Sequence, residues 1–198
     1  MPGSPLQITH RNLPHWKKEG EIYWITFRLA DSLPQKTIEK WRTERDFWVR
    51  DHPHPWDEHQ WREYTTRFSE RLENWLDAGM GSCALRNAQV RQPVIDCLLR
   101  FHRVRHLLHA GVIMPNHVHL ILEPFAGQDL SKLMNGIKGA SSRGCNRILR
   151  KSGQFWMDES YDHIVRSEAQ YDFYRSYIRE NPLKAHLKPG EYWIFDEF

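Results

Sequence analysis

Residues 112–124 read VIMPNHVHLILEP and place two histidines, His117 and His119, one residue apart between a proline turn and an aliphatic run. On an extended strand, residues i and i+2 point to the same face, so both imidazoles project side by side while Val118 faces away. The Leu-Ile-Leu run that follows predicts a strand anchored in a hydrophobic core. Because the stretch VRHLLHAGVIM, residues 104–114, precedes Pro115-Asn116, we expect two strands joined by a hairpin-like turn.

Strand and helix patterns before and after this hairpin predict an α+β fold. A strand is predicted at 21–30, helices at about 37–77 (divided by Pro53 and Pro55), 87–102, 129–150 and 167–182, and an extended segment at 154–166. The order predicts one antiparallel sheet of ferredoxin-like type with helices packed on one face. Residues 35–80 are then a helical insertion after the first strand, within a single domain of residues 1–198.

Composition limits the class of protein. The chain has 198 residues with 40% hydrophobic content, nine Trp and nine Phe, which favours a folded globular protein over disorder. No run approaches the roughly 18 apolar residues of a membrane span, and the polar start is not a signal peptide. The odd set of Cys83, Cys97 and Cys145 has unrelated spacings, which favours reduced thiols and a cytoplasmic location.

Positive charge is concentrated in one segment, although the net charge is only +3. Between Asp129 and Asp158 there is no acidic residue. The cations of this interval are Lys132, Lys138, Arg143, Arg147, Arg150 and Lys151. Such a field attracts phosphates. A solvated helix face has the same pattern, so both interpretations stay open at this point.

Two motifs carry candidate chemistry. The spacing of His117 and His119 suits two imidazoles on one divalent metal ion, although two structural strand histidines have the same spacing. In YRSYIRENP, residues 174–182, Tyr177 and Asn181 are four residues apart and share a helix face. A tyrosine hydroxyl becomes a nucleophile only near a metal or a cation, and an amide oxygen one turn later can complete a metal site. Alternatively, both are ordinary helix residues before Pro182.

Four ordered motifs resemble a known family: MPNHVHLIL, KGASSRGCNRIL, QFWMDESYDHIVR and YIRENPLKAHL. Together they resemble the IS200-like single-tyrosine HUH transposases, and most closely the REP-associated tyrosine transposases. The resemblance covers roughly residues 10–190. It implies a ferredoxin-like domain that cleaves and rejoins single-stranded DNA beside a hairpin, through a 5′-phosphotyrosine and a free 3′-hydroxyl.

The resemblance also implies roles for single residues. His117 and His119 match the metal-binding pair, Tyr177 matches the nucleophile, and Asn181 stands where a third ligand of Mg²⁺ or Mn²⁺ is expected. Compact relatives tend to have Gln at that last position. The basic segment 132–151 becomes a clamp on the DNA backbone, and Trp16 and Trp156 become candidates to stack on bases. A monomer is implied, since the insertion departs from the compact dimeric relatives.

Two other classes of function remain open from the sequence. One is a hairpin-binding protein without catalysis, and the intact His117, His119 and Tyr177 speak against it. The other is a metal-dependent phosphodiesterase that uses water, with Tyr177 only structural. A covalent protein–DNA adduct separates these classes, because only the transposase chemistry forms one.

Overall fold

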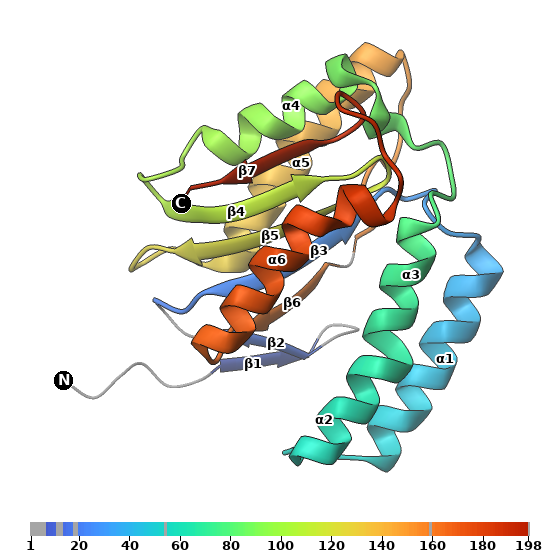
Figure 1. Cartoon of the computed structure of the whole chain (residues 1–198), viewed down its shortest axis with the longest axis vertical. Helices are drawn as coiled ribbons and strands as arrows, with labels where there is room; N and C mark the ends of the chain where they lie inside the picture. The colour runs from blue at the N-terminus through green and yellow to red at the C-terminus, as the bar shows by residue number, and fades with distance from the viewer. Residues whose placement is uncertain (1–6, 11–13, 18–19, 54, 159, 198) are drawn as a thin grey trace.

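The computed structural model describes residues 7–10, 14–17, 20–53, 55–158 and 160–197 (Figure 1). In chain order the elements are β1 (Gln7–His10), β2 (Pro14–Lys17), β3 (Tyr23–Arg28), α1 (Gln35–Asp51), α2 (Glu58–Tyr64), the π-helix η1 (Thr65–Glu70), α3 (Arg71–Asp77), the 3₁₀ helix η2 (Ala84–Arg86), α4 (Ala88–Leu99), β4 (His106–Ile113), β5 (His117–Pro124), α5 (Leu130–Leu149), β6 (Tyr161–Ile164), α6 (Glu168–Lys184) and β7 (Trp193–Asp196).

The main sheet has five antiparallel strands in the order β6-β3-β5-β4-β7. Taken with α4 and α5, the strands β3, β4, β5 and β6 form the β-α-β-β-α-β unit of a ferredoxin-like fold. The last strand, β7, adds to the free edge of β4. The predicted antiparallel sheet and fold class are therefore confirmed. The predicted hairpin is confirmed as β4 and β5, whose register pairs Ile113 with Val118 across the Pro115-Asn116 turn.

Helices cover both faces of the sheet, not one as predicted. Helices α4 and α5 pack together on the first face, as the fold class requires, and a Cβ on Gly144 would lie only 2.7 Å from Pro93. Helix α6 covers the opposite face, where Ile178 joins a second cluster with Ala110 and Val112 (Figure 1). The expectation was wrong for α6 because a helix after the last ferredoxin-like strand is outside that motif.

The insertion after β3 forms a helical layer beside the sheet (Figure 1). Helix α1 ends at Asp51 and α2 begins at Glu58, with Asp57 as its N-cap, so the break predicted at Pro53 and Pro55 is present. The insertion has its own aromatic core, in which Trp48 contacts the rings of Trp56, Tyr64 and Phe68. Among the described residues, no helix is both long enough and apolar enough to cross a membrane.

Candidate active site

The two motif histidines lie on the face of β5 that α6 covers. Both are fully buried, and their ring centroids are 4.7 Å apart at an interplanar angle of 77°. Across β3 their partners are Arg28 for His117 and Thr26 for His119. Val118, between them, points into the core under α4 and α5. The side-by-side projection predicted from the spacing is therefore confirmed.

Asn116 fixes the orientation of the His117 ring. Its side-chain nitrogen donates to the carbonyl of Leu76 at 3.1 Å and to that of Met80 at 2.9 Å. Its oxygen therefore faces His117 Nδ1 at 2.7 Å. Because an amide oxygen only accepts, Nδ1 must carry the proton and donate it. The other ring nitrogen, Nε2, is left with a free lone pair.

His119 is held by different partners. Its Nδ1 lies 2.8 Å from Thr26 Oγ1, and its ring stacks on Trp24 with centroids 4.9 Å apart. Burial lowers the pKa of His117 to about 3, and burial followed by the charge of His117 lowers the pKa of His119 well below its ordinary value. Both rings are thus neutral at physiological pH, the form in which imidazole binds metal ions.

Helix α6 brings Tyr177 and Asn181 to the histidines. The Tyr177 ring lies edge-on at 5.3 Å from the His119 ring and 5.7 Å from Trp24. Asn181, one helical turn later, is fully buried. The N-cap of the helix is Ser167, whose hydroxyl accepts from Gln170 N at 3.2 Å, so the helix begins where the sequence predicts. The structure therefore brings together the four residues that the motifs singled out.

Helix α3 contributes two carboxylates that were not predicted. Asp77 Oδ1 lies 3.5 Å from His117 Nε2. Glu73 lies beside Tyr177, where burial first and then the charge of Glu73 raise the pKa of the Tyr177 hydroxyl. Their i,i+4 spacing is visible in ENWLD, residues 73–77, and would place both on one helix face. Nothing in the sequence relates this face to the histidines, because the contact arises only from the packing of the insertion against the sheet.

Burial shifts the pKa of every acid in the site upward. It raises the pKa of Glu73 to about 7, with a further contribution from the charge of Asp77, and raises the pKa of Asp77 to about 6. Burial, followed by the charges of Glu73 and Asp77, holds the pKa of Tyr177 well above its ordinary value. The neighbourhood therefore disfavours negative charge, and a bound cation would lower all three pKa values.

A cleft of about 990 Å³ opens from Tyr177 between the insertion and α6. Arg166 stacks over the Trp61 ring at 5.3 Å, and the Lys184 ammonium lies 5.4 Å from the Tyr177 ring centre. Phe173, also in the wall, is 63% exposed. Aromatic rings interspersed with cations along a groove are the arrangement that binds unpaired nucleotides by stacking and by phosphate contact.

Several buried polar atoms near Asp77 and Tyr177, two residues of the cleft wall, have no hydrogen-bond partner among the described residues. Within the described part of the chain, no hydrogen-bond partner is present for Nε2 of His117 or His119, for either amide atom of Asn181, or for Asp77 Oδ1. Buried polar atoms normally have partners, because leaving them without one is costly. Two imidazole nitrogens and an amide oxygen are suitable ligands for a divalent ion. The donors present therefore fit the metal that the resemblance implies.

The basic segment lies away from this site. Helix α5 packs on the opposite face of the sheet (Figure 1), where Lys132, Arg143, Arg147, Arg150 and Lys151 are exposed. Lys138 differs from them. It is buried and its ammonium donates to the carbonyls of Met157 and Asp158 at 2.8 and 2.9 Å. The prediction that Lys138 contacts DNA is therefore wrong, because these bonds tie α5 to the loop before β6.

The two tryptophans proposed to stack on bases have different outcomes. Trp156 is only 4% exposed, packs edge-on against Phe27 at 4.8 Å and donates from Nε1 to Ser141 Oγ at 3.0 Å. It is a core residue, so that prediction is wrong. Trp16 lies in β2, but its side chain is outside the described residues, and its role stays a prediction.

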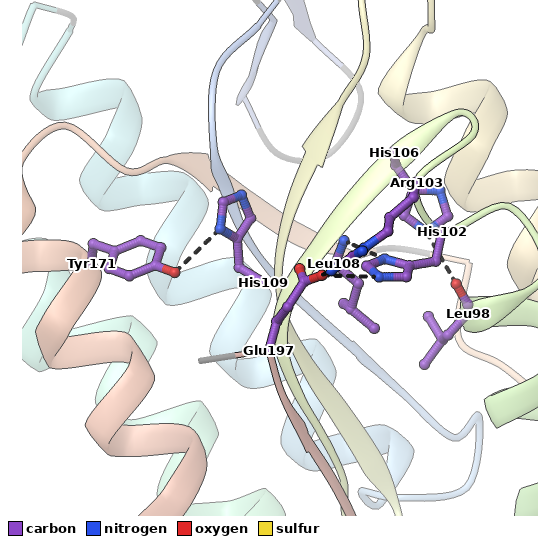
Figure 2. Close-up of polar contacts among 8 residues, drawn as sticks. All are labelled: Leu98, His102, Arg103, His106, Leu108, His109, Tyr171 and Glu197. Carbon is purple, nitrogen blue, oxygen red and sulfur yellow. Dashed lines mark hydrogen bonds and ion pairs between the residues drawn. The ribbon is translucent and has the colours of Figure 1, made fainter.

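A second group of histidines shows what structural histidines look like in this fold (Figure 2). His102 accepts from Leu108 N at 3.1 Å and lies 3.4 Å from Glu197. His109 lies 3.2 Å from the Tyr171 hydroxyl and 3.1 Å from Glu123. Both ring nitrogens of each residue are engaged by protein groups. Among the described residues, His106 and His163 each leave Nδ1 without a partner, so what sets His117 and His119 apart is that two such rings lie side by side, 4.7 Å apart.

One family model matches the middle and C-terminal part of the chain. Residues 94–181 match the family model described as "Transposase IS200 like". This segment runs from within α4 to Asn181 and includes the histidine pair and Tyr177. The match covers less than half of the chain, and it agrees with the family resemblance seen in the sequence motifs.

Two solved structures are similar to the chain at low identity. One is a REP-associated tyrosine transposase bound to a REP hairpin, with 17% identity and a TM-score of 0.44, covering 89% of this chain and 73% of that one. The other is a protein of Deinococcus radiodurans R1 described as a candidate transposase, with 15% identity and a TM-score of 0.34, covering 81% and 89%. No curated protein matches the sequence.

Proposed function

We propose that the chain is a metal-dependent, single-strand DNA endonuclease and strand transferase of the REP-associated tyrosine type. The observation that carries this proposal is the position of Tyr177, whose ring lies 5.3 Å from the His119 ring, in a histidine pair with unpartnered Nε2 atoms. The family model supports the transposase class over the same residues. The proposed substrate is a single strand that carries a hairpin, and the proposed active form is a monomer.

Tyr177 is the proposed nucleophile. Its oxygen attacks a backbone phosphorus and the new bond is a 5′-phosphotyrosine. The bond to the 3′ oxygen of the other DNA segment breaks, and that oxygen takes a proton from solvent to become a 3′-hydroxyl. Attack by that hydroxyl, or by one on another strand, reverses the step and rejoins DNA. No water or external energy source is consumed, because one phosphodiester bond is exchanged for another.

Glu73 is the proposed proton acceptor for this step. Its carboxylate lies beside Tyr177, so it is placed to take the hydroxyl proton as the oxygen attacks. With a pKa raised to about 7 by burial, Glu73 can take this proton and later return it to the leaving tyrosine. This role gives the insertion a part in the chemistry.

His117, His119 and Asn181 are the proposed holders of Mg²⁺ or Mn²⁺. When bound, such an ion polarises the phosphate and offsets the charge that develops on its oxygens. The protein's own part is to present neutral imidazoles: Asn116 holds the proton on Nδ1 of His117, and Thr26 contacts Nδ1 of His119. The rings stay oriented because both are fully buried.

The test is a covalent adduct. A labelled single strand with a hairpin is incubated with the protein and Mn²⁺, and the product is run on a denaturing gel before and after protease. We expect a slow band that protease removes and that a chelator prevents, with the nucleotide located on Tyr177 by mass spectrometry. Cleavage without an adduct would indicate hydrolysis by water, and binding without cleavage would indicate a hairpin-binding protein.

A further inference from the structure

The insertion places a carboxylate directly against the histidine pair. Asp77 is the last residue of α3, and its Oδ1 lies 3.5 Å from His117 Nε2. Both atoms are buried, and the described residues offer neither of them a hydrogen bond. Since Nδ1 of His117 carries the ring proton for Asn116, Nε2 has only a lone pair to present. Two electron-rich atoms therefore face each other with no proton between them.

A cation between the two atoms would resolve this arrangement. Ligand atoms that are each ~2.1 Å from one divalent ion lie about 3.0–3.5 Å from each other, depending on the coordination angle. The separation of 3.5 Å between Asp77 Oδ1 and His117 Nε2 is within that range. Without an ion, the contact between the Asp77 oxygen and His117 Nε2 is not a hydrogen bond, because both atoms are acceptors.

We propose that Asp77 is an additional ligand of the active-site metal, supplied by the insertion and acting with His117, His119 and Asn181. The inference rests on the proposed function, because it assumes that the histidine pair binds an ion. A carboxylate adds negative charge and a hard oxygen to the donor set, and this raises the affinity for Mg²⁺ and Mn²⁺. Among the described residues, His, Cys, Asp and Glu side chains alone form no group of three that could hold an ion, so the proposed set includes the amide oxygen of Asn181.

The way α3 is attached supports this role. Asn116 donates to the carbonyls of Leu76 and Met80, which flank Asp77, and accepts from His117 with its oxygen. One fully buried side chain thus holds both the proposed carboxylate ligand and the imidazole at fixed positions. Consequently, the insertion is part of the metal site, and metal binding should stabilise the end of α3.

Direct measurement of metal binding tests the inference without relying on activity. Mn²⁺ is titrated into the full chain without DNA, and free Mn²⁺ is followed by electron paramagnetic resonance. We expect the Kd of Asp77→Asn to be weaker than that of the wild type by at least about 10-fold, since one charged ligand is removed. The matched control is Asp51→Asn, the same change at an exposed position of the insertion, which should bind as the wild type does.

Two further readouts separate a ligand from a structural residue. The metal-free Tm of Asp77→Asn should equal or exceed that of the wild type, because an unpaired buried carboxylate is removed, whereas its Mn²⁺-induced rise in Tm should shrink. In addition, Mn²⁺ should slow amide hydrogen exchange at residues 72–80 of the wild type and not of the variant. An unchanged Kd together with a lowered metal-free Tm would overturn the inference.

The outcomes also separate this inference from the proposed function. If His119→Ala loses Mn²⁺ binding and Asp77→Asn keeps wild-type affinity, the histidine site stands and the role of Asp77 is wrong. If His119→Ala binds Mn²⁺ as tightly as the wild type, or the wild type binds none, the proposed metal site itself is wrong and the inference fails with it.

Discussion

On one face of β5, Val118, Leu120 and Leu122 are fully buried under α4 and α5; on the other, His117 and His119 are equally buried under α6 and α3. The first three side chains lose only water and gain packing, which stabilises the fold. The histidines lose hydration at Nε2 without a protein partner. Burial of Val118, Leu120 and Leu122 therefore stabilises the fold, whereas burial of His117 and His119 keeps their Nε2 atoms available for a ligand.

The sharpest test of the chemical face is Tyr177→Phe. The substitution removes one oxygen and almost no volume, so folding and DNA affinity should persist. Adduct formation should fall by at least about 10³-fold, because the nucleophile is absent. The measurement is the rate of adduct formation on a denaturing gel with Mn²⁺. Tyr171→Phe, on the same helix but bonded to His109, is the matched control and should keep the wild-type rate.

Another tyrosine could replace Tyr177 only by leaving its present partner. The Tyr174 hydroxyl lies 2.7 Å from His163 Nε2, and the Tyr161 hydroxyl lies 3.4 Å from Ser69. An adduct that persists in Tyr177→Phe and disappears when Tyr161, Tyr171 or Tyr174 is changed to Phe would show that the nucleophile is misassigned.

Substitutions on the two faces of β5 should have opposite effects: one should lower stability and spare cleavage, and the other should abolish cleavage and spare DNA binding. Leu120→Ala should lower the free energy of unfolding by about 2–5 kcal/mol, because it leaves a cavity in the packed core. Molecules that remain folded should still cleave DNA. Either His117→Ala or His119→Ala should abolish cleavage while hairpin binding persists. Urea unfolding curves, together with cleavage rates normalised to the folded fraction, measure both effects. Normal cleavage by both histidine variants with Mn²⁺ present would disprove the metal site.

The basic helix should affect binding and not chemistry, because α5 lies on the face opposite Tyr177. Neutralising Arg143, Arg147 and Arg150 together should weaken hairpin binding and reduce the slope of log K against log salt by about 0.7–0.9 for each DNA phosphate that the protein no longer neutralises. The rate of adduct formation at saturating protein should stay at the wild-type value. Fluorescence anisotropy between 50 and 200 mM salt (a range of about fourfold) measures the slope.

The control for this triple variant removes the same charge elsewhere. Lys36, Lys40 and Arg50 lie on α1 in the insertion, and changing all three to Gln should leave the slope unaltered if the cluster on α5 binds the DNA. An equal decrease of the slope in both variants would mean that only net charge matters. A normal slope in the α5 variant would mean that this cluster faces away from DNA.

The smallest expected effect concerns pH and Glu73. Its folded pKa of about 7 lies above the usual value, so the folded state holds its proton more tightly, and its contribution to stability falls as pH rises from about 4.5 to 7. Glu73→Gln should therefore raise the Tm of the metal-free protein at pH 8 by a few degrees, since ~1 kcal/mol corresponds to about 2–4 °C at this size. At pH 4 the gain should vanish.

The buried histidines also make stability depend on pH, in the direction opposite to Glu73. Comparing the variant with the wild type at each pH cancels this contribution. The depressed pKa values of the histidines make stability fall as pH drops below about 6.5, and this acts on both proteins alike. Glu39→Gln, an exposed change on α1, is the control and should show no difference between the two pH values. A gain of the same size at both pH values would mean that the ionisation of Glu73 does not cause it.

Much of the fold follows from local patterns. The strand patterns in 104–124 predict β4, β5 and the shared face of the histidines, and the helical pattern in 167–182 predicts α6. These features depend on backbone geometry over a few residues, which periodicity and capping report directly. Charge along 129–150 also predicts the helix α5. It does not predict that Lys138 is buried, because burial depends on what packs against each helix face.

The sequence by itself determined the sheet-forming hairpin, the histidine pair, and the tyrosine and asparagine one helical turn apart. Only the tertiary structure decided that α6 covers the histidine face, that Trp156 is a core residue, and that Asp77 and Glu73 join the site. Asn116 and Leu76 are 40 residues apart, and their contact has no local signal. Such contacts arise when whole elements pack, because burial and shape complementarity select among arrangements that each local segment permits equally.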